Sequence, residues 1–463
     1  MKGWIFVFLV ATGTIWLAPK HGMAQTKGKA LVKPKVQTAG KQKPSIKPAA
    51  KPKLAIGTAA AAPDSAAMAA ELMVEEVEML ATVTIGGTEV PFWFDLKTIG
   101  SKKMTASIRN GAEVIPCKER PLENDSVLFA IPVFESEIRC KIERTAKGYE
   151  AKGSFVRYDG AKERRYPFMA TDSKGVATRF PIKYASVLPL QPRYAVSFGK
   201  KEGGKMAVGA FKTLEGNMIT GTFETPTGDY RHLEGVLSGD SLFLSCFDGT
   251  HAYRIEAQVS SSPAGGDSLK GVLISGGRRE PFWGKGDDAA RLPDALTLSK
   301  PASEKPVFTT YQDLLGKPVS LADPEFVGKA VVLQVMGTWC PNCMDETAFL
   351  SEYAATKKPA DLAIVGLAFE RKTDPAFVKG RIDKLRERYA VPYPVWIGGL
   401  NRSDSASARM PYISKVAAFP TTVFLDKSHV VRYVHTGFSG PATGAEYEDF
   451  KKEFDRLVAE VRK

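Results

Sequence analysis

Residues 331–346 read V-V-L-Q-V-M-G-T-W-C-P-N-C-M-D-E, and this stretch decides the fold of the C-terminal part of the chain. Its apolar run starts one residue earlier, ends at Met336 and is typical of a buried strand. Two cysteines three positions apart follow, and helical spacing continues to residue 355. A buried strand that leads into a Cys-x-x-Cys sequence and a helix indicates redox chemistry where the two elements meet.

The sequence after residue 298 alternates long apolar strands with helical patterns. We expect strands at 330–336, 362–369, 394–397, 421–425 and 430–434, and helices at 345–355, 375–389 and 444–461. This β-α-β-α-β-β-β-α order predicts an α/β sandwich around a mixed sheet, which we place at residues 306–463.

The region in front of it, residues 75–298, consists of short apolar or alternating runs broken by Gly, Asp and Pro, which predicts an all-β structure of antiparallel strands. It contains a weak internal repeat: Asp125 precedes Pro167 by 42 positions, and Asp240 precedes Pro281 by 41. We expect two weakly similar units, at 75–180 and 190–298. They can form two small sheets, or one larger sandwich or open barrel.

The first 24 residues have the features of a secretory signal peptide. Lys2 precedes an apolar stretch from Trp4 to Ala18, and the small-x-small sequence Gly22-Met23-Ala24 follows. An uncleaved membrane anchor is the alternative, although the stretch is short for a membrane span. Residues 25–74 repeat Lys, Pro, Ala and Gly and have too little apolar surface to fold, so we expect a disordered basic linker.

The formal net charge of +13 belongs mostly to this front segment. Eleven lysines precede the first acidic residue, Asp64. The folded part is therefore not strongly basic, and we expect no nucleic acid as a partner.

Five cysteines are too few for a disulfide-dense scaffold in a chain of 463 residues. Cys117 and Cys140 are close enough in sequence to bridge neighbouring strands, or they are reduced and buried. Cys246 has no obvious partner, and we place it in the core. We assign no active site and no metal to the β-rich region.

Cys340 and Cys343 are the candidate redox pair. Cys340 is expected at the helix N-terminus, where unsatisfied N–H groups and the helix dipole favour an anion, so we assign it as the nucleophile. Cys343 lies one turn further and suits the thiol that resolves a mixed disulfide. Pro341 fits the first turn of the helix without the loss of a hydrogen bond.

Other uses of a Cys-x-x-Cys sequence fit less well. A zinc site needs a second pair of ligands, and only His429 and His435 follow in this region, without Cys partners. A purely structural disulfide is a poor use of so tight a ring. The Pro-x-x-x-Thr-x-x-Cys sequence expected of a peroxidatic cysteine is absent, because Thr338 is two residues before Cys340 and the proline is missing.

The segment 331–346 resembles the TlpA/ResA group of exported thioredoxin-like proteins. Residues 417–422, A-A-F-P-T-T, resemble the cis-proline loop of this family, and Pro318–Leu321 resembles its lead-in hairpin. The resemblance covers residues 306 to 463 and implies a thioredoxin-like fold. More loosely, the β-rich front resembles accessory domains that are fused to such proteins in Bacteroidetes-type bacteria.

The resemblance also implies roles for residues around the cysteines. Pro420 corresponds to the cis-proline, which places the backbone of Phe419 beside the Cys340 sulfur, where it pairs with an extended substrate. Trp339 shields the active-site face.

Glu346 matches the family's acid near the pair, which tunes thiol acidity and relays a proton from Cys343. The alternative is an ordinary solvated acid in the first helical turn. Gln334 stands where cytosolic thioredoxins have a buried Asp, so that carboxylate is missing here.

The sequence thus predicts a protein-disulfide reductase in the bacterial periplasm, without a cofactor. It exchanges dithiol and disulfide with protein clients, and a membrane electron donor reduces it again. The alternatives are a disulfide oxidase or isomerase, or a ligand- or partner-binding β-module with an appended redox domain. The sequence specifies neither the client and the donor nor the oligomeric state.

Overall fold

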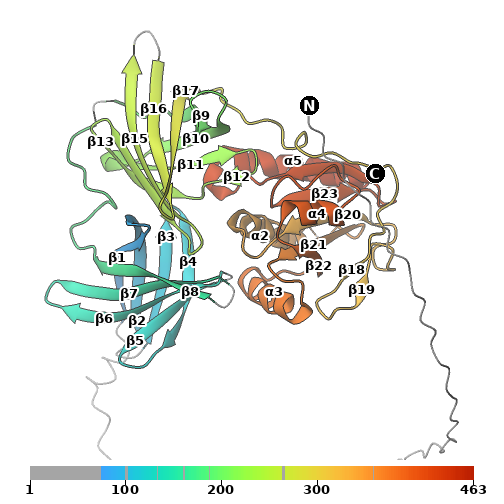
Figure 1. The fold of residues 1–463 in the computed structure, drawn as a ribbon, viewed down its shortest axis with the longest axis horizontal. Helices are drawn as coiled ribbons and strands as arrows, with labels where there is room; N and C mark the ends of the chain where they lie inside the picture. The colour runs from blue at the N-terminus through green and yellow to red at the C-terminus, as the bar shows by residue number, and fades with distance from the viewer. Residues whose placement is uncertain are drawn as a thin grey trace, which may run out of the picture. The chain divides into compact units, whose positions relative to one another are not determined.

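The computed structural model describes residues 74–99, 103–132, 134–159, 162–186, 188–262, 266–357 and 359–463. The expected signal peptide and all of the expected linker except Val74 lie outside these residues. Three sheets make up the structure (Figure 1). Within the described segments, the helices are too short or too polar to cross a membrane.

The first sheet is a closed eight-stranded barrel. Its strands are β1 (Val74–Ile85), β2 (Thr88–Ile99), β3 (Lys103–Asn110), β4 (Glu113–Pro121), β5 (Ser126–Ile131), β6 (Ser136–Thr145), β7 (Gly148–Asp159) and β8 (Lys162–Asp172). Each strand pairs with the next, and β1 pairs with β8 to close the ring. Alternate residues of β1 point inward, so the apolar set from Val77 to Ile85 faces the core. Phenylalanines fill the interior, among them Phe92, Phe94 and Phe129.

The second sheet has nine strands. They are β9 (Arg193–Phe198), β10 (Lys205–Thr213), β11 (Met218–Thr225), β12 (Gly228–Asp229), β13 (Leu233–Ser238), β14 (Ser241–Phe247), β15 (Ala252–Ser262), β16 (Gly266–Ser275) and β17 (Arg278–Gly286), with a 3-10 turn, η1 (Glu215–Asn217), before β11. Strands β10 and β11 also pair, so this sheet closes on itself as well. The β-rich region is therefore two barrel-like sheets, which resolves the choice that the sequence left open.

The two segments of the repeat are paired in the same way. In the first barrel, Gly153 on β7 lies opposite Phe168 on β8. In the second sheet, Gly271 on β16 lies opposite Phe282 on β17. Both phenylalanines are buried in the core of their own sheet. Each segment is thus a meander of four strands that places one aromatic ring at an equivalent position.

The third sheet has seven strands in the order β19-β18-β22-β21-β20-β23-β24. They are β18 (Tyr311–Gln312), β19 (Pro318–Val319), β20 (Ala330–Met336), β21 (Leu362–Glu370), β22 (Val395–Leu400), β23 (Thr421–Leu425) and β24 (Val431–Thr436). The helices are α2 (Pro341–Thr356), α3 (Pro375–Tyr389), α4 (Ser403–Arg409) and α5 (Ala445–Val461), with a 3-10 turn, η2 (Pro441–Thr443). Strands β20, β21 and β22 are parallel, and β23 is antiparallel to β20, so the sheet is mixed as expected.

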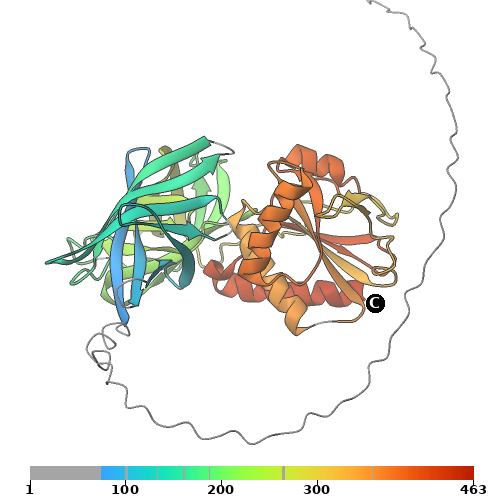
Figure 2. The same ribbon diagram turned by 90° about the horizontal axis from the view of Figure 1, so that it is seen from below.

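Apolar side chains cover both faces of this sheet, and helices lie on both sides of it (Figure 2). On one face, Val332 packs in a cluster with Leu350 of α2 and Leu457 of α5. On the other face, Leu333 packs in a cluster with Met410, directly after α4. This alternation of neighbouring residues explains why the strand is apolar throughout. The thioredoxin-like α/β fold expected for the C-terminal part is confirmed.

The chain segment before residue 306 also contacts this sheet. The Thr436 N–H donates to the Ala295 carbonyl at 3.2 Å, and the Ala302 N–H donates to the Tyr412 carbonyl at 2.9 Å. The segment before residue 306 is thus hydrogen-bonded to the C-terminal part.

Candidate active site

Strand β20 ends at Met336, and Cys340, four positions later, directly precedes helix α2. Cys340 is the N-cap residue of α2, and its sulfur accepts the Cys343 N–H at 3.2 Å. Pro341 occupies the start of the helix, where its missing N–H costs nothing. Cys340 and Cys343 are joined as a disulfide. The helix N-terminus therefore directs an N–H group at the sulfur that we assign as the nucleophile.

The two cysteines differ in exposure. Cys340 is 7% exposed, whereas Cys343 is fully buried. A client sulfur therefore reaches Cys340 first, and Cys343 is placed to attack from inside.

The loop before β23 lies beside this pair. The Phe419–Pro420 peptide bond is cis, as the resemblance implied. The Phe419 carbonyl oxygen lies 3.6 Å from the Cys340 sulfur. The Trp339 indole N–H donates to the Phe369 carbonyl at 2.9 Å. The Trp339 ring packs edge-on against the ring of Phe419, with 5.4 Å between the ring centroids. The structure thus brings Trp339, Phe419 and Pro420 together around Cys340.

Glu346 is buried, at 1% exposure, so the solvated alternative for this acid is wrong. The Thr422 hydroxyl donates to one carboxylate oxygen at 2.5 Å, and the Gln334 amide donates to the other at 2.9 Å. Burial raises the pKa of Glu346 to about 7, although these two hydrogen bonds lower it. A carboxyl group with this pKa accepts and releases protons near neutral pH, as acid–base chemistry at the cysteines requires.

Gln334 joins Glu346 to a network of buried hydrogen bonds. Its amide oxygen accepts the Tyr393 hydroxyl at 3.2 Å, and its amide nitrogen also donates to the Thr347 hydroxyl at 3.1 Å. The strand position that carries an Asp in cytosolic thioredoxins thus supplies the hydrogen-bond donor here, and the helix supplies the acid.

Glu370 is a site residue that the sequence analysis missed. Its carboxylate accepts the Thr338 N–H at 2.6 Å and is 2% exposed, and burial raises its pKa. Arg381 on α3 donates to the Thr338 hydroxyl at 3.0 Å. Met336 pairs with Ala368 on the parallel strand, so Thr338 and Glu370, each two positions beyond this pair, meet. The expected parallel pairing of these two strands could have indicated that the Glu370 carboxylate binds the loop before Cys340.

The β-rich region also contacts the active-site helix. The Asn342 side chain, between the two cysteines, donates to the Asp229 carbonyl at 3.4 Å. Arg231, just after β12, forms an ion pair with Asp345. Nothing in the local sequence of either segment indicated these contacts.

The remaining cysteines are free and buried. Cys117 lies opposite Ala106, and Cys140 lies opposite Val127, so neither faces the other across a strand pair. Burial raises the pKa of Cys117 and of Cys140 to about 12, and raises that of Cys246 well above its usual value. These three thiols form no disulfide and belong to the cores of their sheets.

In the reduced protein, alkylation near neutral pH is expected to label Cys340 at least about tenfold faster than Cys343, because only Cys340 combines exposure with the helix N-terminus. Peptide mass spectrometry over time measures both rates. Cys117, Cys140 and Cys246 are internal controls that react last. Faster labelling of Cys343 would reverse the assigned roles.

The part of the chain that carries this site is similar to known proteins. Residues 300–450 match the Redoxin family model. The chain is 27% identical over 137 residues to the thiol-disulfide oxidoreductase ResA of Halalkalibacterium halodurans, which covers 29% of this chain and 69% of that protein. It is 27% identical over 176 residues to the thiol:disulfide interchange protein DsbE of Escherichia coli. This match covers 36% of this chain and 83% of that protein.

A solved structure is also similar, the thioredoxin-family thiol:disulfide interchange protein of Chlorobium tepidum. It is 23% identical, and the match covers 35% of this chain and 97% of that chain with a TM-score of 0.26. The part of the chain that carries Cys340 and Cys343 thus matches the Redoxin family model and is similar to the thiol-disulfide oxidoreductases ResA and DsbE.

Proposed function

We propose that this protein is a periplasmic protein-disulfide reductase that transfers electrons from Cys340 and Cys343 to the disulfides of client proteins. The observation that carries the proposal is the position of Cys340, whose sulfur lies at a helix N-terminus beside the Phe419 carbonyl. Export rests on the signal-like sequence of the first 24 residues.

The reaction proceeds in two exchanges. The Cys340 thiolate attacks one sulfur of the client disulfide, that bond breaks, and a mixed disulfide forms while the other client sulfur leaves and takes a proton. Cys343 then loses its proton and attacks the Cys340 sulfur, which releases the second client thiol. The client gains two electrons and two protons, and Cys340 and Cys343 become a disulfide.

Glu346 is proposed as the group that receives the Cys343 proton. It lies one helical turn beyond Cys343, and its raised pKa suits a proton acceptor near neutral pH. An ionised Glu346 opposes a second negative charge at the cysteines. The reduced cysteine pair is then less stabilised as a thiolate. A less stabilised reduced form gives up its electrons more readily, so Glu346 supports a role as a reductant.

The backbone beside Cys340 suits an extended client. We propose that Phe419 and Pro420 bind the client chain next to its disulfide, and that Trp339 covers one side of it. A membrane electron donor then returns two electrons to the Cys340–Cys343 disulfide.

The Cys343→Ser variant tests the proposal, because it stops the reaction at the mixed disulfide. Expressed in the envelope, it is expected to accumulate disulfide-linked adducts with client proteins, which non-reducing electrophoresis and mass spectrometry identify. Cys340→Ser is the matched control and forms none. The reduction potential of the pair, measured against glutathione, checks the direction: a value as oxidising as that of the envelope oxidases would contradict the reductase and favour an oxidase.

A further inference from the structure

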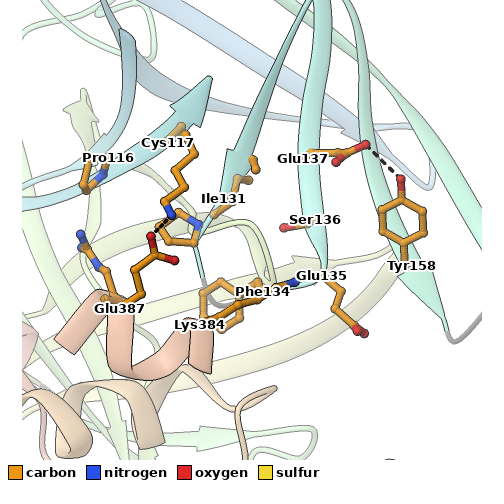
Figure 3. A pocket seen from close by; sticks show the side chains of 14 residues that line it. Pro116, Cys117, Ile131, Phe134, Glu135, Ser136, Glu137, Tyr158, Lys384 and Glu387 are labelled. Atoms are coloured by element: carbon orange, nitrogen blue, oxygen red, sulfur yellow. Dashed lines mark hydrogen bonds and ion pairs between the residues drawn. The ribbon is translucent and has the colours of Figure 1, made fainter. Parts of the chain in front are cut away.

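A pocket of about 630 Å³ lies between the first barrel and helix α3. Figure 3 shows barrel strands on one side of it and the helix on the other. Pro116, Ile131 and Phe134 form part of its apolar lining. Lys384 and Arg388 reach it from α3. The pocket therefore combines an apolar wall with cationic groups.

The acidic residues that line this pocket are already paired. Glu135 forms an ion pair with Arg381 at 3.1 Å, Glu137 pairs with Arg139 at 2.5 Å, and Glu387 pairs with Lys118. Each carboxylate thus has its cation, so none of them neutralises a further positive charge in the pocket.

Two cations of the pocket have no carboxylate partner among the residues that the structure describes. Lys384 is exposed on α3. Arg388 lies one turn further and has its guanidinium over the ring of Tyr389 at 5.7 Å. The open charge of the pocket is therefore positive and suits a carboxylate.

This pocket continues toward the cysteines. A narrower pocket of about 40 Å³ shares Phe134, Glu135, Ser136 and Tyr158 with it and is also lined by Trp339. Trp339 directly precedes Cys340. The two pockets together, which we name the client groove, thus lead from Lys384 and Arg388 to the edge of the redox site.

The β-rich region covers the approach to the cysteines over Asn342. Gly228 of β12 packs against Asn342 so tightly that a Cβ atom at Gly228 would overlap the Asn342 side chain. The Asn342 side chain also donates to the Asp229 carbonyl. A client therefore does not reach the cysteines over Asn342, whereas the client groove leads to Trp339.

We propose, on the basis of the function proposed above, that the client groove binds an extended client segment with an apolar side chain and carboxylates close to its disulfide. The apolar side chain packs against Ile131 and Phe134, and the carboxylates pair with Lys384 and Arg388. The groove thereby selects acidic over neutral or basic client segments.

Binding is tested first without redox chemistry. A fluorescent peptide with Leu, two Asp and Ser in place of each Cys is titrated with the oxidised full-length protein, and anisotropy reports the affinity. Lys384→Glu and Arg388→Glu are each expected to weaken binding about tenfold, because attraction becomes repulsion. Added salt weakens the wild-type affinity, since these charges are solvent-accessible.

Lys379→Glu is the matched control, because it makes the same charge change on the same helix. Lys379 pairs with Asp383 and does not line the pocket. It is expected to leave the affinity unchanged. A peptide with Lys in place of Asp should bind Lys384→Glu more tightly than it binds the wild type.

The same variants are then reduced and mixed with the disulfide form of the peptide. The rate constant for the acidic peptide should fall about tenfold in Lys384→Glu, while the rates for an Asn-containing peptide and a small aromatic disulfide stay unchanged. Equal binding of acidic and neutral peptides by the wild type would overturn the client groove. Acidic-peptide binding without reduction of any disulfide would keep the groove and overturn the proposed function.

Discussion

The Arg231→Met variant is expected to lose about 3–5 kcal/mol of the free energy of unfolding, because it leaves two largely buried carboxylates without their cation. Arg231 has a side-chain exposure of 6%, and its guanidinium contacts acids from three parts of the chain. It pairs with Glu113 at the start of β4 and with Asp345 on α2, and its Nε lies 3.7 Å from Asp248.

These acids depend on Arg231 to different degrees. Burial alone would raise the pKa of Asp248, but His251 and Arg231 lower it to about 2, so Asp248 keeps one partner in the variant. Burial raises the pKa of Asp345 to about 7 against the pull of Arg231. Glu113 and Asp345 lose their cation in the variant.

Guanidinium chloride denaturation followed by tryptophan fluorescence measures the loss. Arg432→Met is the control, since Arg432 pairs with Asp426 and Glu304 at a side-chain exposure of 46%, and it should cost at most about 1 kcal/mol. Arg231→Lys keeps the charge without the planar fork and should lie between the two. Equal losses for Arg231→Met and Arg432→Met would show that water, and not Arg231, satisfies the acids.

The Glu346→Gln variant is expected to be more stable than the wild type at pH 8 by roughly 3 kcal/mol in the oxidised state. The folded protein holds the pKa of Glu346 at about 7, against an ordinary value of 4.5. Each pKa unit corresponds to about 1.4 kcal/mol. At pH 8 the wild type is less stable because the Glu346 carboxyl gives up its proton more readily in the unfolded chain than in the folded protein.

Proton binding by the folded and unfolded states decides whether wild-type stability rises or falls with pH. Between pH 4.5 and 7 the unfolded chain releases the Glu346 proton while the folded protein keeps it, so the folded state binds more protons and wild-type stability falls as pH rises. Below pH 4.5 both states are protonated and the contribution is fully present. Glutamine does not titrate, so the difference between variant and wild type grows from near zero at pH 4.5 to its full value at pH 8.

The glutamine fits the site with little change in packing. The Thr422 hydroxyl can rotate to accept the new amide, while the Gln334 amide still donates to the remaining oxygen. Denaturation curves at a series of pH values measure the difference. Glu352→Gln, at an exposed position of the same helix, is the control and should show only a small difference. A stability difference between Glu346→Gln and the wild type that stays the same at every pH would mean that the Glu346 carboxylate is solvated.

The same variant should also change the reduced protein. An ionised Glu346 opposes a further negative charge, so Glu346→Gln should lower the apparent pKa of the cysteine pair. The pH dependence of Cys340 alkylation measures it.

The sequence by itself determined the features that depend on neighbouring residues. The apolar strand before Trp339, the spacing of Cys340 and Cys343, and the position of Cys340 at a helix start are set within one short segment. The same holds for the α/β order of the C-terminal part, because periods of two and of 3.6 residues are local properties. The cis bond at Pro420 came from the family resemblance and not from the pattern.

Only the tertiary structure decided which polar groups meet. The sequence left open whether Glu346 is a solvated first-turn acid, and Gln334 and Thr422, from two neighbouring strands, enclose it. Cys117 and Cys140 were open to pairing until the barrel register placed other residues opposite them. Closing of the two β-rich sheets was likewise undecided, since a strand's pattern shows its buried face but not its partner.

The ion pair of Arg231 with Asp345 joins residues 114 positions apart. A buried charge is stable only where a partner from elsewhere in the chain reaches it, and the sequence around either residue carries no mark of that partner. Local patterns therefore specified the redox centre, whereas long-range packing specified the protonation and the surroundings of that centre.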